Sequence, residues 1–187
     1  MDDRTLKIAV LLAAHVIFLS AGALRLIRGQ RGHQLVAKAP WWIQYYPPLV
    51  WVPFLVAYFQ PLAIDIDQSL QLAGLALAIV AAIFGAWGMW SLGKSYGIRL
   101  DIFDGHRLKT DGPYAFVRHP MYLGIVLYHL GATLVLQSPL LLALTALVIV
   151  PFTWVRIAHE ERALREAFGE RYARYQETVP ALLPFAR

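Results

Sequence analysis

The chain has 187 residues, of which 58% are apolar and 16% charged, with a formal net charge of +5 and a mean hydropathy of +0.51. This is more apolar surface than one water-soluble domain can bury, so the composition argues against a soluble enzyme and favours a helical membrane protein. The chain has no cysteine, which excludes disulfide frameworks, thiolate zinc sites and cysteine nucleophiles. A metal site would need His and carboxylates alone, and we expect none.

Two uncharged stretches near the start of the chain predict membrane helices. Residues 8–24 form the first, which is near the lower length limit for a span of roughly 20 residues. A cleaved signal peptide is the competing interpretation, but Asp2 and Asp3 spoil a basic leader and no small-residue cleavage site follows. Residues 41–64 form the second stretch, and its four prolines indicate a helix that begins late or is kinked.

Two further apolar stretches complete the predicted bundle. Residues 68–93 carry small residues at spacings of three and four, which is typical of a close-packed helix interface. These small residues are Gly74, Ala78, Ala81 and Gly85. Residues 120–155 have no formal charge, and Gln137-Ser138-Pro139 in their middle predicts the turn of a helical hairpin. We therefore expect an all-α integral membrane fold with about five transmembrane helices.

The distribution of basic residues predicts the orientation of the bundle. All but two of the 17 Lys and Arg residues fall in residues 25–38, 94–118 and 156–187, which should therefore be cytoplasmic. Alternation over five spans then puts the N-terminus outside and the C-terminus inside, with Asp65 and Asp67 in an outer loop. The positive charge reflects this topology and attraction to anionic lipid. We expect no nucleic-acid partner, because basic and aromatic residues do not interleave as a base-stacking surface requires.

Two histidines lie inside the predicted helices. His15 stands alone in the first helix, where a packing role is the more frequent one. His129 lies ten residues after His119 and could face the same interior side, but packing is again the more frequent role.

The first polar cluster, residues 105–124, directly precedes and begins the fourth helix. It combines two His, three basic residues, two Tyr and three Gly. Asp111-Gly112-Pro113 is a turn sequence, Pro120 suits the first turn of a helix, and the N–H groups at that helix start favour an anion. A basic loop that only contacts lipid headgroups would not need two His and ordered turns, so the cluster favours a functional site.

The second polar cluster, residues 156–175, follows the last membrane helix. Its apolar stripe predicts an amphipathic interfacial helix on the cytoplasmic side, and most of its Arg and Glu residues suit a solvated face. The stripe consists of Leu164, Phe168, Tyr172 and Tyr175. Glu160 and Glu161 are different, because they lie where the helix leaves the lipid, about one turn from Arg156. A carboxylate there could hold a ribose or a sulfonium while Arg156 holds an anionic substrate.

Four motifs occur in order along the second half of the chain. They are His106-x-Leu108-x-Thr110-x-Gly112-x-Tyr114; Arg118-His119-Pro120-x-Tyr122-x-Gly124; Glu160-Glu161 with Phe168-Gly169-x-x-Tyr172-x-x-Tyr175; and Val179-Pro180 with Leu183-Pro184-Phe185. Together they resemble the isoprenylcysteine carboxyl methyltransferase family and the wider group of small membrane methyltransferases, over residues 93–185. The resemblance implies one methyltransferase domain, residues 1–187. In it, residues 1–92 supply three membrane helices, and residues 93–187 supply a cofactor-binding loop, the hairpin and the C-terminal helix.

The resemblance also implies an activity and a site. The cofactor would be S-adenosyl-L-methionine, with S-adenosyl-L-homocysteine as product, bound at the cytoplasmic membrane face. The acceptor would be a lipophilic or lipidated molecule that enters from the bilayer. Carried over to this chain, the residues around the cofactor are His106, Gly112, Tyr114, Arg118, His119 and Tyr122, with Glu161 on its ribose or amino end. Arg156 and Glu160 would orient the methyl acceptor.

Several acceptors and one other cofactor fit this pattern. A C-terminal carboxylate has a pKa of about 3.5, so it is ionised at neutral pH and needs no general base. This favours carboxyl methylation of an isoprenylcysteine-like substrate. Phospholipid amines or small thiols are alternatives, and an amine would need Glu160 or His119 as a base. Membrane sterol reductases, which use NADPH, share a similar C-terminal block but are longer. A transporter or scaffold lacks support, since no inverted repeat occurs.

Overall fold

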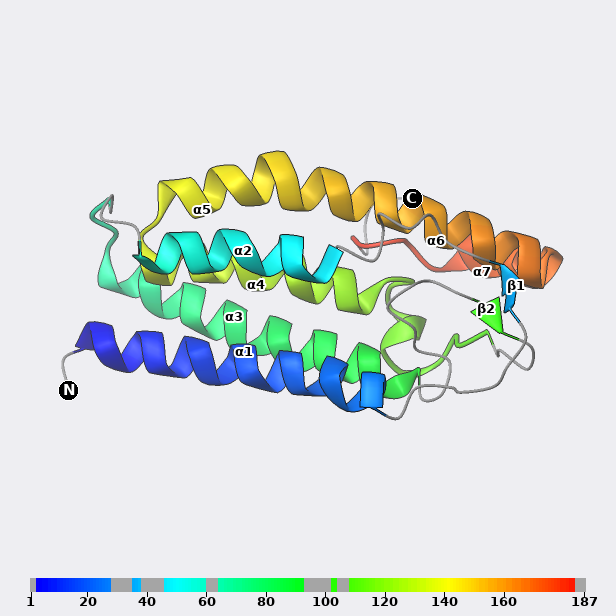
Figure 1. Cartoon of the computed structure of the whole chain (residues 1–187), viewed down its shortest axis with the longest axis horizontal. Coiled ribbons are helices and arrows are strands. Elements are labelled where there is room, and N and C mark those ends of the chain that lie inside the picture. Colours follow the sequence, from blue (N-terminus) through cyan, green and yellow to red (C-terminus); the bar gives the residue numbers. More distant parts are fainter. Residues whose placement is uncertain are drawn as a thin grey trace.

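The structure is a computed structural model that describes residues 3–27, 35–37, 46–59, 64–92, 102–103 and 108–183 (Figure 1). The helices in chain order are α1 (Asp3–Ile27), α2 (Tyr46–Phe59), α3 (Gln68–Ser91), α4 (Pro120–Leu136), α5 (Pro139–Leu144), α6 (Val150–Phe168) and α7 (Glu170–Thr178). A 3₁₀ turn (Gly112–Ala115) precedes α4, and a π-helical turn (Thr145–Ile149) joins α5 to α6. Two short strands, β1 (Leu35–Ala37) and β2 (Ile102–Phe103), complete the described part.

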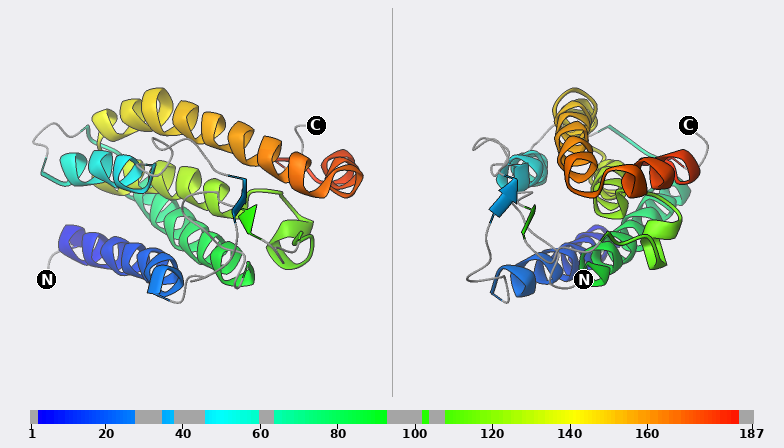
Figure 2. Two further views of the ribbon diagram at one scale, coloured as in Figure 1. Left: turned by 45° about the vertical axis from the view of Figure 1, so that its right-hand side comes forward. Right: turned by 90° about the vertical axis from the view of Figure 1, so that its right-hand side faces the viewer.

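The long helices lie alongside one another, and α7 and both strands lie at one end of the bundle (Figures 1 and 2). Two helical segments, Gln68–Ser91 and Pro139–Phe168, are long and apolar enough to cross a membrane. Shorter apolar segments, Thr5–Ser20 and Pro120–Leu136, lie in α1 and α4. Each apolar stretch that the sequence singled out therefore contains a helix, and the described part of the second stretch is helical from Tyr46 to Phe59.

Helices α3 and α4 form the most extensive helix pair in the described structure. They approach closely because glycines face each other at two levels. A Cβ on Gly74 would lie 2.8 Å from the carbonyl oxygen of Gly131, and a Cβ on Gly124 would lie 2.8 Å from Cα of Gly85. The small-residue stripe of α3, including the fully buried Ala78, is therefore a backbone-to-backbone contact, as predicted.

The hairpin turn also lies where the sequence placed it. Gln137 has a φ of 52° and ends α4, and the Ser138 hydroxyl accepts from the N–H of Leu141 at 3.1 Å, capping α5. The carbonyl of Gln137 accepts a hydrogen bond from the N–H of Ile64 at 3.0 Å. This bond ties the hairpin turn to the segment that leads into α3.

Two features differ from the sequence prediction. The predicted interfacial helix over residues 156–175 is not one element, because α6 continues from the apolar region to Phe168 and Gly169, with a φ of 52°, separates it from α7. The pairing of β1 with β2 is antiparallel, joining Leu35 to Phe103, whereas the predicted all-α fold contained no strand. Strands of two and three residues are too short to leave a period-two pattern in the sequence.

The two histidines inside the helices pack against other parts of the bundle, as expected. The His129 ring is fully buried, and its two nitrogens lie 2.8 Å from the carbonyl of Ile125 and 3.0 Å from that of Val50. The His15 ring contacts Trp51, with 4.0 Å between ring centroids. Both histidines thus belong to an aromatic cluster that joins α1, α2 and α4.

The contact between α3 and α4 leads to a stability prediction. Gly131→Ala should lower the free energy of unfolding by about 2 kcal/mol, since the new methyl group would lie 2.8 Å from the backbone nitrogen of Ala78. Ala76→Val, which adds volume on the exposed side of α3, is the matched control and should leave stability nearly unchanged. Thermal unfolding in detergent measures both, and equal melting temperatures for the two variants would contradict this interface.

Candidate active site

The loop before α4 is anchored on both sides by Tyr114. Its hydroxyl donates to the carbonyl of Gly88 in α3 at 3.2 Å, and its own carbonyl accepts from the hydroxyl of Tyr175 in α7 at 2.6 Å. Pro113 is the second residue of this turn, and Pro120 begins α4 a few residues later. The two anchors therefore fix the position of the polar residues that lie between the turn and the helix.

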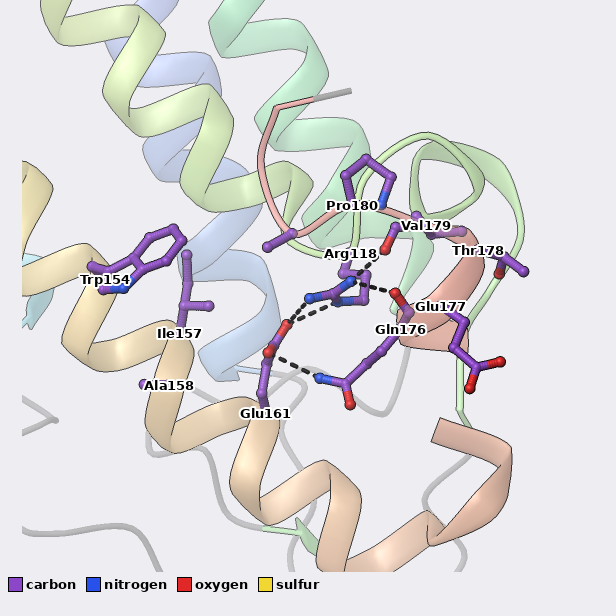
Figure 3. Close-up of a pocket in the computed structure, with 11 residues that line it drawn as sticks. Arg118, Trp154, Ile157, Ala158, Glu161, Gln176, Glu177, Thr178, Val179 and Pro180 are labelled. Atoms are coloured by element: carbon purple, nitrogen blue, oxygen red, sulfur yellow. Dashed lines mark hydrogen bonds and ion pairs between the residues drawn. The ribbon is translucent and has the colours of Figure 1, made fainter. Parts of the chain in front are cut away.

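Arg118 joins this loop to α6 and α7. Its Nε donates to Oε1 of Glu161 at 2.8 Å, and one terminal nitrogen lies 2.6 Å from the same oxygen. The other terminal nitrogen donates to the backbone carbonyls of Gln176, at 3.2 Å, and Val179 (Figure 3). A guanidinium that holds a carboxylate and two carbonyls is a rigid clamp, because its planar fork fixes all these donors together.

The segment after α7 is also paired with this loop through the backbone. The N–H of Arg118 donates to the carbonyl of Pro180 at 2.8 Å, and the N–H of His119 donates to the carbonyl of Ala181 at 3.1 Å. These two N–H groups, which directly precede α4, are therefore used by the chain itself. The C-terminal motif thus contributes to the site by holding the Arg118-His119 loop.

The carboxylate of Glu161 accepts hydrogen bonds from several side chains of this site. Besides the Arg118 contacts, Oε1 lies 3.1 Å from Nε2 of His119, and Oε2 accepts from the side-chain amide of Gln176 at 3.0 Å. Burial alone would raise the pKa of Glu161, but the hydrogen bonds and positive charge of His119 and Arg118 outweigh it and lower that pKa to about 2. Glu161 is therefore ionised throughout the physiological range.

His119 lies between the two adjacent carboxylates. Its Nδ1 is 3.9 Å from Oε2 of Glu160, while its Nε2 contacts Glu161. Consecutive helical residues point about 100° apart, so Glu160 and Glu161 leave α6 in different directions. Glu160 accepts a hydrogen bond from the hydroxyl of Tyr122 at 2.8 Å. One imidazole thus connects two faces of α6.

Arg156 lies on the Glu160 face and is 2% exposed. Its Nε donates to the hydroxyl of Tyr122 at 2.7 Å, and that hydroxyl donates in turn to Glu160. Its guanidinium carbon lies 4.9 Å from the ring centroid of Tyr46 and 5.8 Å from that of Tyr122. Removing a guanidinium from water is costly, and these contacts offset part of that cost.

The structure brings six of the predicted site residues into one connected network. They are Arg118, His119, Tyr122, Arg156, Glu160 and Glu161. Gly112 and Tyr114 lie apart from the network: a Cβ on Gly112 would face Trp87, and Tyr114 anchors the loop through Gly88. His106 lies outside the described residues.

Three residues that contact the network, Gln176, Thr153 and Tyr46, could not be identified as site residues from the sequence. Gln176 bonds to Glu161 with its amide nitrogen and accepts from Arg165, and Thr153 bonds to the hydroxyl of Tyr46 at 2.7 Å. A single amide or hydroxyl inside a helix has no characteristic spacing, so only the folded structure reveals these partners. The four prolines in residues 41–64 predicted a helix that begins late or is kinked, but they gave no indication of a role for the Tyr46 ring.

A cavity of about 580 Å³ borders the Glu161 face of α6 (Figure 3). Arg118 and Glu161 form part of its wall, and Trp154 and Ile157 form an apolar side. Residues 176–181 close it from the side of α7. Its volume lies within the roughly 300–1,000 Å³ of small-molecule sites. Arg118 and Glu161 on its wall form an ion pair with each other, and Glu177 is a third charged residue of the lining. Among the described residues, no group of three or more His, Asp or Glu side chains could hold a metal ion.

Comparisons with known proteins match a large part of this chain. The model of the isoprenylcysteine carboxyl methyltransferase (ICMT) family matches residues 74–166. Protein-S-isoprenylcysteine O-methyltransferase B of Arabidopsis thaliana is 32% identical over 114 residues, which are 60% of this chain and 58% of the relative. The protein-S-isoprenylcysteine O-methyltransferase of Rattus norvegicus is 32% identical over 63% of this chain and 42% of its own length.

A solved structure has a similar fold. It is that of the eukaryotic intramembrane Ras methyltransferase ICMT, with a TM-score of 0.60 and 28% identity over 80% of this chain and 55% of that one. The chain therefore belongs to the isoprenylcysteine carboxyl methyltransferase family and is a helical integral membrane protein. It spans less than two thirds of the length of these relatives.

The Glu161 cluster predicts a pH dependence of stability. Because folding lowers the pKa of Glu161 from 4.5 to about 2, its contribution is fully present above about pH 4.5 and is lost as the pH falls towards 2. Near pH 6, Glu161→Gln should be less stable than the wild type by about 2 kcal/mol, and this gap should shrink towards pH 3. Thermal unfolding in detergent measures the gap at each pH.

The matched control for this prediction is Glu166→Gln, which removes an exposed carboxylate from the same helix. It should follow the wild type at every pH, since surface charges contribute little. A gap between wild type and Glu161→Gln that stays constant from about pH 6 to pH 3 would contradict the ionised cluster.

Proposed function

We propose that this chain is an S-adenosyl-L-methionine-dependent methyltransferase that methylates the carboxylate of an isoprenylcysteine-like acceptor. The observation that carries the proposal is the connection of Glu161, His119, Glu160, Tyr122 and Arg156 at the end of an apolar helix. The relatives' names specify O-methyl transfer to protein S-isoprenylcysteine, which agrees with this chemistry. The whole chain, residues 1–187, would form one domain with five membrane spans, its N-terminus outside and its site facing the cytoplasm.

The donor side of the site would be the end nearest Glu161. S-adenosylmethionine supplies an electrophilic methyl group on a positively charged sulfonium. Glu161 would supply negative charge near that cation, and the rings of His119 and Tyr122, 5.6 Å apart, would supply aromatic faces. Arg118 would act by holding Glu161 in place, and Gly112 and Tyr114 by anchoring the loop. His106 keeps its proposed role from the family motif.

The acceptor side would be the face of α6 that carries Arg156. A guanidinium is charged at any physiological pH and pairs with a carboxylate through parallel hydrogen bonds. A carboxylate acceptor is already ionised, so no residue has to remove a proton. The surrounding apolar groups would weaken its hydration shell, which otherwise limits its nucleophilicity. Orientation of the two reactants and desolvation would therefore account for most of the rate enhancement.

An amine acceptor, as in phospholipid N-methylation, fits this geometry less well. A protonated amine would be repelled by Arg156, and its proton would have to pass to Glu160 or His119. Glu160 is already bonded to Tyr122, which competes for that role. The buried guanidinium therefore favours an anionic acceptor.

Single substitutions should separate the two sides of the site. His119→Ala and Glu161→Ala should each weaken binding of S-adenosylhomocysteine about tenfold or more, since each removes a hydrogen-bonding group from the network. Arg156→Ala should bind it within about twofold of wild type but lose methyl transfer by about a hundredfold. Calorimetry measures the affinity, and transfer of a radiolabelled methyl group to N-acetyl-S-farnesylcysteine measures turnover.

The outcome that would remove these assignments is equal cofactor affinity in the wild type, His119→Ala and Glu161→Ala. The matched control is Glu166→Ala, which removes an exposed carboxylate from α6 and should leave affinity and turnover unchanged. Transfer to phosphatidylethanolamine vesicles, with none to the farnesylcysteine probe, would instead support the amine acceptor.

The proposed topology has its own test. Since the chain lacks cysteine, single cysteines can be introduced at the exposed positions of Asp65 and Glu166. A membrane-impermeant maleimide should label Asp65→Cys from outside intact cells and Glu166→Cys only in inverted vesicles. The reverse pattern would contradict the proposed orientation.

A further inference from the structure

Tyr46 lies where α2, α4 and α6 meet, and it is 2% exposed. Its hydroxyl lies 2.7 Å from that of Thr153. Its ring is stacked parallel to Phe152, with 5.8 Å between centroids, and perpendicular to Tyr122 at 5.6 Å. The ring of Tyr46 is therefore held from three directions by α4 and α6.

This ring forms one face of the Arg156 environment. The guanidinium carbon lies 4.9 Å from the ring centroid, within the distance at which a cation is attracted to an aromatic face. Thr153 lies one helical turn before Arg156 on the same face of α6, so its bond to Tyr46 holds the ring beside the guanidinium. The hydrogen bond from Nε of Arg156 to the hydroxyl of Tyr122 fixes a second edge of the guanidinium. Together these contacts restrict the plane in which the guanidinium can lie.

We infer that Tyr46 is a positioning residue that sets the orientation of Arg156 towards the acceptor carboxylate, with Thr153 as its anchor. The inference rests on the proposed function. A guanidinium recognises a carboxylate best when the two planes are aligned, so a ring that fixes the guanidinium plane increases acceptor affinity. The helix that carries Tyr46 precedes the residues that the family model matches, which begin at residue 74, so α2 would contribute to acceptor selection from outside that match.

The contacts that hold Glu161 on the donor side do not involve Tyr46, which contacts that side through the Tyr122 ring. Glu161 is held by Arg118, His119 and Gln176, all of which belong to the loop before α4 or to α7. A change at Tyr46 should therefore alter the KM of the acceptor and leave cofactor affinity unchanged. A residue with only a structural role would instead lower both affinities and stability together.

The test compares three variants in methyl transfer to N-acetyl-S-farnesylcysteine and in binding of S-adenosylhomocysteine. Tyr46→Leu removes the ring and should raise the acceptor KM about tenfold, with cofactor affinity within about twofold of wild type. Tyr46→Phe keeps the ring but loses the bond to Thr153, and Thr153→Val loses the same bond from the other side. Both should raise the acceptor KM by about threefold.

The matched control is Phe59→Leu, the same aromatic change on the exposed end of α2, which should behave as wild type. A wild-type acceptor KM in Tyr46→Leu would overturn the inference. If that variant does not fold, wild-type KM values in both Tyr46→Phe and Thr153→Val would overturn it. Absence of methyl transfer in the wild type would count against the proposed function itself, so the two failures are distinguishable.

Discussion

The ion pair between Arg118 and Glu161 is the contact on which the rest of the site depends. It joins the loop before α4 to the polar end of α6, and the same guanidinium holds the end of α7 through backbone carbonyls. Three segments far apart in sequence thus meet at one charged pair. Because Glu161 is partly buried, the loss of Arg118 would leave a carboxylate with too few partners, which is far costlier than the loss of a surface pair.

Helix α6 divides the polar end of the bundle into two chemically different faces. Glu161 faces the clamp, whereas Arg156 and Glu160 face Tyr122 and α2. Only a helix that continues without a break from the apolar region can present both faces at fixed positions. The uninterrupted segment Pro139–Phe168 meets this requirement, and the glycine contacts between α3 and α4 give it a rigid support. His119 then joins the two faces, with a hydrogen bond to Glu161 and a 3.9 Å contact to Glu160.

Much of this architecture could be read from the sequence, because apolar length and turn residues are local signals. The hairpin turn at Gln137 and the small-residue interface of α3 both follow from such patterns. The break at Gly169 was missed, since the apolar stripe continues at helical spacing across it. The motifs identified both clusters, but they could not reveal that Arg118 holds Glu161 or that Tyr46 covers Arg156. Those contacts depend on tertiary packing.

The central claim is that the polar end of this bundle binds a methyl donor. Calorimetric titration of the detergent-purified protein with S-adenosylhomocysteine, with NADPH as the control titrant, tests it most directly. The account predicts saturable binding of S-adenosylhomocysteine and none of NADPH. Binding of NADPH alone, or of neither compound, would contradict it.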